Sequence, residues 1–285
     1  MRIDLHTHSS VSDGTESPAE LLASAREAGL DVVALTDHDT TGGWAAAEAA
    51  RPSGLTVVPG MEMSCRWFPD DEPPISVHLL AYLFDPLHPA FAAERARLRD
   101  ERLERAERIV RALAADGHPV DWDELVTHAA GGVVGRPHIA GALVRGGVVG
   151  SVEEAFGTLL HHRSSYYVAK ADTDVRQGIE LVRAAGGVPV FAHGRATKRG
   201  RVVGDDAIAV MADAGLLGLE VDHPDHDDGE RAHLRRLAGE LDLIATGSSD
   251  YHGTNKATPI GACTTDPAQY ERLVAAGTGT SPLRD

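Results

Sequence analysis

Cysteine is scarce in this sequence, with only Cys65 and Cys263 among 285 residues. A disulfide framework is excluded at this length and count, and the usage favours a reducing compartment, so we expect a cytoplasmic protein. Long apolar runs are also missing, since none approaches the roughly 20 residues of a membrane span. No basic segment followed by a short apolar run opens the sequence, so we expect neither a secretory signal nor a membrane partner.

Basic residues are the minority charge. The sequence has 27 Lys and Arg against 43 Asp and Glu, which gives a formal net charge of -16 at pH 7. Such a chain repels nucleic acid over most of its surface, so we expect no stable duplex nucleic acid as a partner. Acidic residues that surround divalent cations would account for part of this charge, so a small phosphorylated substrate is compatible with it.

Histidine, in contrast, is abundant, with 15 residues, and two of them stand in the N-terminal stretch His6-Thr7-His8. The period of two in an extended chain puts His6 and His8 on one face, where two imidazoles suit a shared metal ion. Asp13 follows just before a turn at Gly14. Taken alone, a polar strand end would give the same His-x-His pattern, so the rest of the chain has to decide.

Apolar strand-like runs alternate with helical stretches through most of the chain. The expected strands cover residues 2–5, 31–35, 55–59, 75–84, 188–192, 218–221 and 243–246. The expected helices between them cover residues 17–28, 44–50, 173–185, 205–214 and 228–240. Ser17, Pro18 and Glu20 are typical of a capped helix start. This alternation predicts a parallel β/α barrel or a layered α/β sheet.

The middle of the chain breaks this alternation. Residues 86–166 are mostly helical in pattern and contain no strong strand, so we expect a helical insertion that caps a barrel formed by 1–85 and 167–285. The arginines of the run 95–111 alternate with glutamates, which predicts an exposed helix with i,i+4 pairs rather than a nucleic-acid surface. The segment after residue 275 is rich in Gly and Thr and is expected to be loose.

Metal-ligand residue types recur near the ends of the expected strands. Such residues are His6, His8, Asp13, His38, Glu62, His193, Asp250 and His252, with His78 inside a strand. The carboxyl ends of barrel strands meet on one face, where active sites lie. Imidazole and carboxylate ligands without cysteine suit manganese, iron or zinc. Their number implies more than one ion, with a shared carboxylate and an activated water.

These motifs together resemble the polymerase and histidinol phosphatase (PHP) family. They are His6-Thr7-His8, Asp13, Thr36-Asp37-His38, Glu62, His78, His193 and Asp250-Tyr251-His252. The resemblance implies a distorted seven-stranded (β/α) barrel that holds two or three divalent ions, manganese first and iron or zinc as alternatives. The stretch Gly135-Arg136-Pro137-His138-Ile139-Ala140, followed by Ala142-Leu143-Val144, resembles the stand-alone PHP phosphoesterases. Characterised members of that group remove the 3′-phosphate of nucleoside 3′,5′-bisphosphates or trim short oligoribonucleotides from the 5′ end.

The resemblance also implies a ligand set for each ion of a trinuclear site. The first ion would take His6, His8, Glu62 and Asp250. The second would share Glu62 and take His78 and His193, and the third would take Asp13, His38 and His252. A hydroxide held by the metals would attack phosphorus, and either His193 or His252 would assist the leaving oxygen.

The expected substrate side chains are Arg136, His138, Lys170, Arg195, His223 and His226. By resemblance, Arg136 and Lys170 stand where the group binds phosphate, and Arg136 would occupy the N-cap of a helix that begins at Pro137. The chain departs from the family at Gly194-Arg195, where a proline often follows the histidine. It departs again at Asp222-His223-Pro224, where an aromatic residue is common. Both departures lie near the expected substrate, so they affect the prediction of the substrate more than that of the metal site. His223 and His226 would either line the substrate pocket or be loop residues without a functional role.

The sequence therefore predicts a metal-dependent phosphoesterase of a nucleotide, most consistent with the 3′-phosphate of nucleoside 3′,5′-bisphosphates and short oligonucleotides. A histidinol-phosphate-type phosphatase is the alternative within the enzyme class, and the Gly-Arg-Pro-His stretch argues against it. A non-catalytic metal- or nucleotide-binding protein is the alternative of another class, and the complete ligand set argues against that. The sequence predicts no oligomeric state.

Overall fold

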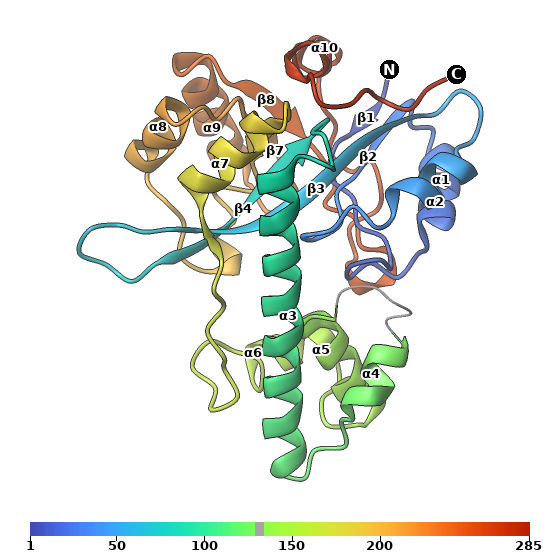
Figure 1. Ribbon diagram of the computed structural model, residues 1–285, viewed down its shortest axis with the longest axis vertical. Coiled ribbons are helices and arrows are strands. Elements are labelled where there is room, and N and C mark those ends of the chain that lie inside the picture. The colour runs from blue at the N-terminus through green and yellow to red at the C-terminus, as the bar shows by residue number, and fades with distance from the viewer. Residues whose placement is uncertain (129–133) are drawn as a thin grey trace.

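The strands form a nearly closed barrel in the computed structural model, which describes residues 1–128 and 134–285. Within these residues seven strands follow one another in the order β1-β2-β3-β4-β6-β7-β8 (Figure 1). Their bounds are β1 Ile3–Asp4, β2 Val32–Leu35, β3 Thr56–Trp67, β4 Ile75–Tyr82, β6 Val188–Phe191, β7 Gly218–Asp222 and β8 Ile244–Gly247. The edges approach where the backbone N–H of His8 donates to the carbonyl of Tyr251 at 2.9 Å. The predicted seven-stranded barrel is confirmed.

Strand β4 runs against its neighbours, which the predicted parallel arrangement did not include. It pairs antiparallel with both β3 and β6. Strands β3 and β4 are joined by a hairpin over residues 68–74 without a crossover helix, and such a connection allows only antiparallel pairing. Strand β3 is also longer than the predicted 55–59, because its second half pairs with β4 and with the short strand β5 (Thr173–Asp174). Figure 1 shows this hairpin projecting from the barrel.

Six helices of the described residues cover the barrel. They are α1 Pro18–Glu27, α2 Trp44–Ala50, α7 Val175–Ala184, α8 Asp205–Asp213, α9 Asp228–Glu240 and α10 Pro267–Ala276. Helix α1 has the capping box expected from its sequence, with Ser17 and Glu20 each accepting from the other's backbone N–H. Helix α10 was not predicted, although Asp266 caps it and Pro267 occupies its first turn. The tail is not loose at Leu283, which pairs with Val57 through two backbone hydrogen bonds of 2.9 and 2.8 Å.

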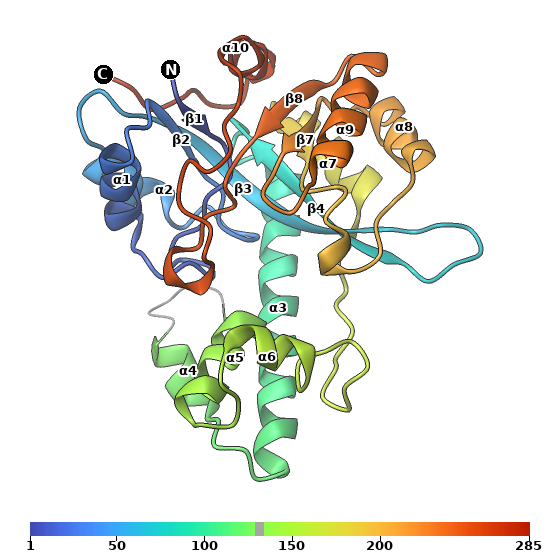
Figure 2. The same cartoon turned by 180° about the vertical axis from the view of Figure 1, so that it is seen from behind.

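A long helix connects the barrel to a separate helical lobe. Helix α3 (Pro89–Ala115) has 27 residues and extends well beyond the barrel, and Figures 1 and 2 show the other three helices gathered along its far half. These are α4 Trp122–His128, α5 Arg136–Arg145 and α6 Val152–Gly157. The lobe has its own apolar core, in which Ile109 and Leu113 of α3 pack with Leu143 of α5. The predicted insertion 86–166 contains residues 129–133, which lie outside the described residues.

The barrel interior is filled with apolar side chains. All four residues of β2 are buried, and its side chains alternate between two packing layers. Val33 and Leu35 pack with α1, whereas Val32 and Ala34 pack with Tyr82. A filled interior leaves polar side chains room only at the strand ends, so any site built on this barrel lies there. No helix of the described residues combines the length and the apolar character that a membrane crossing requires.

Candidate metal centre

The nine predicted ligands meet at one end of the barrel. His6 and His8 follow β1, and Asp13 lies in the loop between β1 and α1. The others come from or follow five further strands: His38 after β2, Glu62 in β3, His78 in β4, His193 after β6, and Asp250 and His252 after β8. His38 and Glu62 face each other through an isolated parallel bridge, which brings the ends of β2 and β3 into register. The topology therefore gathers residues that are far apart in the chain.

Glu62 is the hub of this cluster. Its Oε2 lies 3.2 Å from His6 Nε2, 3.1 Å from His8 Nε2 and 3.2 Å from His38 Nδ1. Its Oε1 lies 2.6 Å from His78 Nδ1 and 2.9 Å from His193 Nε2. One buried carboxylate therefore touches five imidazoles, divided between its two oxygens. A carboxylate placed in this way would be able to serve two neighbouring ions.

Two further carboxylates complete the cluster. Asp250 Oδ1 lies 3.6 Å from His6 Nε2 and 3.5 Å from His8 Nε2. Asp13 Oδ1 lies 3.4 Å from His252 Nε2, and Asp13 Oδ2 lies 3.5 Å from His38 Nε2. His8 stands between the two, because its Nδ1 faces Asp13 at 3.5 Å. The side chains form one continuous set rather than separate pairs.

Three groups of ligand atoms in the described residues each fit within 4.8 Å. They are His8 with Asp13, His38 and His252; His6 with His8 and Asp250; and His38 with Glu62 and His78. These groups overlap with the three ligand sets that the resemblance implies but differ from them in two ways: His8 and His38 each occur twice, and Glu62 occurs once instead of in two sets. His193 joins none of these groups, although its Nε2 contacts Glu62. The assignment of ligands to individual ions stays a prediction.

The donor atoms fit divalent metal. The Nε2 atoms of His6 and His8 lie only 3.0 Å apart, a separation that needs a proton or a cation between them. His38 Nδ1 is buried without a hydrogen bond in the described part of the chain. The donors are imidazole nitrogens and carboxylate oxygens without a thiolate, which suits manganese, iron or zinc.

The protonation states of His8, His193 and Glu62 also favour ligation. Burial and then the neighbouring His252 lower the pKa of His8 to about 4. Burial and then Arg199 lower the pKa of His193 to about 3. Burial alone would raise the pKa of Glu62, but His78, His38 and His6 hold it well below its usual range. Neutral imidazole and ionised carboxylate are the forms that bind metal.

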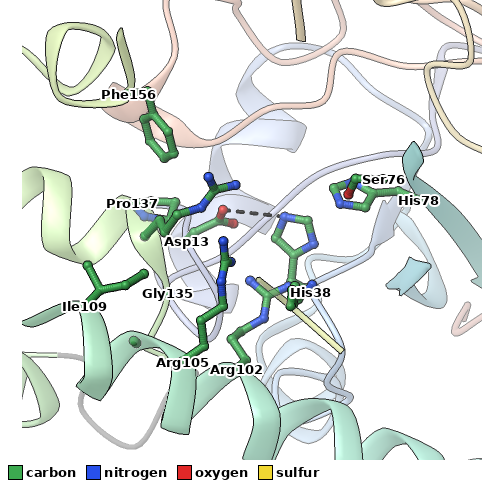
Figure 3. Close-up of a pocket in the computed structure, with 13 residues that line it drawn as sticks. Asp13, His38, Ser76, His78, Arg102, Arg105, Ile109, Gly135, Pro137 and Phe156 are labelled. Carbon is green, nitrogen blue, oxygen red and sulfur yellow. Dashed lines mark ion pairs between the residues drawn. The ribbon is translucent and has the colours of Figure 1, made fainter. Parts of the chain in front are cut away.

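A cationic pocket opens beside the cluster, between the barrel and the helical lobe. Its volume is about 130 Å³, and Figure 3 shows Asp13, His38 and His78 of the cluster lining it together with side chains of the lobe. The basic residues that line it are Arg102, Arg105, Arg136 and Lys170, and Ile109 and Phe156 add apolar surface. The pocket thus places positive charge next to the predicted metal ligands.

Two of these four cations are neutralised by buried carboxylates. Arg102 donates from Nε and Nη2 to Asp39 Oδ2 at 3.1 and 2.7 Å, and Lys170 lies 2.8 Å from Asp172 Oδ1. Burial alone would raise the pKa of Asp39, but Arg102 and Lys170 hold it low. This network ties α3 to the loop that carries His38.

The other two cations, Arg105 and Arg136, have no carboxylate partner within 4.0 Å among the described residues. Arg105 donates to the carbonyl of Val168 at 2.7 Å, and the guanidinium of Arg136 lies 5.3 Å from the ring centre of Phe156. Burial and then the charge of Arg136 lower the pKa of Arg105 to about 10. A bound anion would relieve the repulsion between these two largely buried positive charges.

The remaining predicted substrate residues lie in different places. Arg195 turns to Asp205 and lies 3.3 Å from His233 Nε2, and it does not line the pocket. The ring of His226 contacts backbone at both nitrogens, the carbonyl of Val221 at 2.9 Å and the N–H of Arg195 at 3.2 Å. His223 Nε2 lies 3.4 Å from Asp250 Oδ2, next to the cluster.

The start of α5 corrects one prediction. The N-cap is Gly135 and not Arg136, which is the first residue of the helix, and Pro137 follows it. His138 Nδ1 accepts from the N–H of Gly135 at 3.2 Å and so acts as part of the cap. The side chain of Arg136 still lines the pocket, because residue 136 lies at the helix end that faces the cluster.

Sequence analysis missed Arg102 and Arg105 as site residues. The arginine-rich run was predicted to be exposed, which is wrong for these two, because both line the pocket and Arg102 is only 12% exposed. Their spacing in the sequence indicates a buried position. Arg102 and Arg105 lie on the same helical face as the apolar residues Leu98 and Ile109, which come one turn before and one turn after them. Arg199 and Lys256 were also missed, and both contact Asp250 Oδ2, at 2.5 and 2.7 Å.

The chain is similar to known proteins over most of its length. The PHP domain profile matches residues 4–156. A 5′-3′ exoribonuclease of Haemophilus influenzae is 34% identical over 88% of this chain and 90% of its own. A 3′,5′-nucleoside bisphosphate phosphatase of Chromobacterium violaceum is 32% identical over 88% of this chain and 87% of its own. A solved Bifidobacterium adolescentis structure, assigned as a metal-dependent phosphoesterase, has a TM-score of 0.90 and 36% identity. The match covers 97% of this chain and 96% of that one.

Proposed function

This chain belongs to the PHP domain family and is a metal-dependent phosphoesterase, and we propose that it removes the 3′-phosphate of nucleoside 3′,5′-bisphosphates. Short oligonucleotides with a 5′-phosphate are the second proposed substrate class, because one relative is named an exoribonuclease. The free thiols of Cys65 and Cys263 support a reducing, cytoplasmic location.

One observation carries the substrate proposal. The guanidinium groups of Arg105 and Arg136 lack carboxylate partners in the described part of the chain and line the same pocket as Asp13, His38 and His78. A substrate with two phosphates would place one at the cluster and the other between the arginines. The second phosphate would relieve the repulsion between two partly desolvated cations, and each guanidinium can offer two N–H groups to it.

The proposed ligands are the nine side chains at the strand ends, in the three sets that the resemblance implies, with manganese as the expected ion. When bound, two or three divalent ions would stabilise negative charge on the phosphate oxygens and lower the pKa of a water. Glu62, Asp13 and Asp250 offset the charge of the ions, and burial of these carboxylates strengthens that attraction.

The side chains of this protein have two further tasks in the proposed reaction. Arg105 and Arg136 hold the phosphate that does not react, which fixes the position of the other phosphate at the cluster. Water adds to phosphorus, the bond to the 3′ oxygen breaks, and that oxygen needs a proton. Solvent supplies that proton, and either His193 or His252, which both lie at the cluster, is proposed to assist the leaving oxygen. The products are inorganic phosphate and a nucleoside 5′-phosphate.

Histidinol phosphate fits the pocket less well. It carries one phosphate and an ammonium group, and with the phosphate at the cluster the ammonium would approach Arg105 and Arg136. Like charges in a partly desolvated site repel strongly. The same pocket therefore favours a bisphosphate over this alternative, and membership of an enzyme family argues against a purely metal-binding role.

The experiment compares phosphate release from adenosine 3′,5′-bisphosphate, adenosine 3′-monophosphate and histidinol phosphate, with added Mn²⁺. We expect kcat/KM for the bisphosphate to exceed that for the 3′-monophosphate by about 30-fold or more, which corresponds to ~2 kcal/mol. Histidinol phosphate should be the poorest of the three. Equal kcat/KM for all three substrates would contradict the proposal.

A further inference from the structure

Glu220 is a buried carboxylate in β7 that neither the predicted ligand set nor the predicted substrate set includes. Its side chain is 0% exposed and lies behind the metal cluster. Its Oε1 lies 3.1 Å from His6 Nδ1 and accepts the hydroxyl of Ser248. Its Oε2 accepts the backbone N–H of His193 at 2.6 Å. One side chain thus joins the ends of β1, β6 and β8.

The contact with His6 fixes which ring nitrogen faces the cluster. His6 Nε2 lies 3.2 Å from Glu62 Oε2 and 3.0 Å from His8 Nε2, so this nitrogen is the one directed at the proposed ions. A carboxylate accepts a hydrogen bond only from a protonated Nδ1. The proton is therefore held on Nδ1, and Nε2 is the nitrogen that can bind an ion.

The contact with His193 supports an unusual backbone. His193 has φ of 33°, in the left-handed region that residues other than glycine rarely adopt. Its backbone N–H lies at the end of β6 and donates to Glu220 Oε2. This bond helps to keep the side chain of His193 directed at Glu62, which its Nε2 contacts at 2.9 Å.

We propose that Glu220 is a positioning residue of the metal centre, which sets the tautomer of His6 and the orientation of His193 before metal binds. The proposal rests on the proposed function in one respect, since it takes His6 and His193 as metal ligands. It adds that the affinity for metal depends on a carboxylate that touches no ion itself.

A carboxylate is needed because all three neighbours donate. The donors are His6 Nδ1–H, the hydroxyl of Ser248 and the N–H of His193, and two carboxylate oxygens can accept all three. In Glu220→Gln, which has nearly the same shape, one oxygen becomes NH₂. If the NH₂ faces His193, two donors oppose each other. If it faces His6, the ring must accept at Nδ1, and its proton moves to Nε2, where it blocks metal.

Asp4 provides a matched control. It is also a fully buried carboxylate, and it accepts from the N–H and hydroxyl of Ser249 at 3.0 and 2.5 Å and from the N–H of Gly261 at 2.8 Å. Its carboxylate also accepts from the backbone N–H of His6 at 3.4 Å, but it contacts no imidazole ring among the described residues. Asp4→Asn therefore removes a buried negative charge and disturbs a buried network close to the barrel end, but leaves the tautomer of His6 unchanged.

The experiment measures Mn²⁺ binding by calorimetry to metal-free wild type, Glu220→Gln, Asp4→Asn and His6→Ala, with the melting temperature of each. We expect Glu220→Gln to weaken Mn²⁺ binding by about 10- to 100-fold, as the loss of such outer partners does elsewhere. Asp4→Asn should lower the melting temperature but change the dissociation constant less than about threefold, well below that range. A purely structural role of Glu220 would give the Asp4→Asn pattern and overturn the proposal.

Two outcomes separate this proposal from the ligand assignment. If His6→Ala loses affinity while Glu220→Gln binds like wild type, the ligand assignment stands and the role of Glu220 is refuted. If His6→Ala itself binds like wild type, the assignment of His6 fails, and the proposal fails with it. Should Glu220→Gln not fold, ¹⁵N spectra of histidine-labelled, zinc-loaded wild type decide, with His6→Ala to identify the signal. We expect the Nδ1–H tautomer at His6, and the Nε2–H tautomer would overturn the proposal.

Discussion

Replacing Arg136 by alanine should lower kcat/KM strongly without lowering the melting temperature. The guanidinium lies in the pocket beside the cluster, stacks on Phe156 at 5.3 Å and has no carboxylate partner among the described residues. Truncating one partner of a buried charge pair costs about 2–4 kcal/mol, so kcat/KM for adenosine 3′,5′-bisphosphate should fall roughly 30- to 700-fold. The same change relieves repulsion with Arg105, which offsets the loss of a cation–π contact of about 1 kcal/mol.

The assay is phosphate release under pseudo-first-order conditions, combined with the melting temperature and the metal content of each variant. Arg136→Lys keeps the charge but loses the planar fork, so it should recover only part of the activity. Arg111→Ala is the matched control, because Arg111 lies on α3 with a side chain that is 75% exposed. For adenosine 3′-monophosphate, which lacks the second phosphate, Arg136→Ala should matter much less. An unchanged kcat/KM for the bisphosphate would refute the role of Arg136.

Two predictions concern ion pairs of helix α3. Asp39→Asn leaves the charge of Arg102 uncompensated in a site where the two side chains are 0% and 12% exposed, and should cost about 3–5 kcal/mol in urea unfolding. Asp39→Asn combined with Arg102→Met should cost less, and a larger cost would refute the pairing. Burial alone would raise the pKa of Glu94, but hydrogen bonds from Arg97 and Thr173 hold it below its usual value. This stabilisation is present above the unfolded pKa and is lost as pH falls through the folded pKa. Glu94→Gln should therefore lower stability by about 1 kcal/mol near neutral pH and by less in strong acid, whereas a pH-independent difference would refute the linkage.

Local signals in the sequence were enough for much of the barrel. The apolar run 31–35 and the capping box at Ser17 and Glu20 each specify their element within a few residues, and the structure has both. The ligands were found because residues such as His6 and Asp250 follow apolar runs, and strand ends meet on one face of a barrel. The barrel fold thus explains why ligands that are far apart in the sequence could be predicted to lie together.

What escaped prediction depends on contacts between distant residues. The direction of β4 follows from the hairpin 68–74, which the sequence does not reveal as long as the second half of β3, where Met63 pairs with Leu79, is not recognised as a strand. Arg105 was classed as exposed because its sequence neighbours are charged, although its position on α3 faces the cluster. Glu220 lies within the predicted strand 218–221. Its role depends on partners from three other segments of the chain, which the sequence pattern does not bring together.

The most direct test of the central claim is the metal content of the chain, measured by elemental analysis on protein purified without chelator and set beside its phosphatase activity. With nine nitrogen and oxygen ligands at the strand ends, we expect about two to three equivalents of transition metal per chain. Removal by chelator should abolish activity, added Mn²⁺ should restore it, and His8→Ala should lose both metal and activity, because His8 contacts Glu62, Asp250 and Asp13. Less than about one equivalent under metal-replete conditions, with activity intact, would contradict the claim that this cluster is a metal centre that performs the reaction.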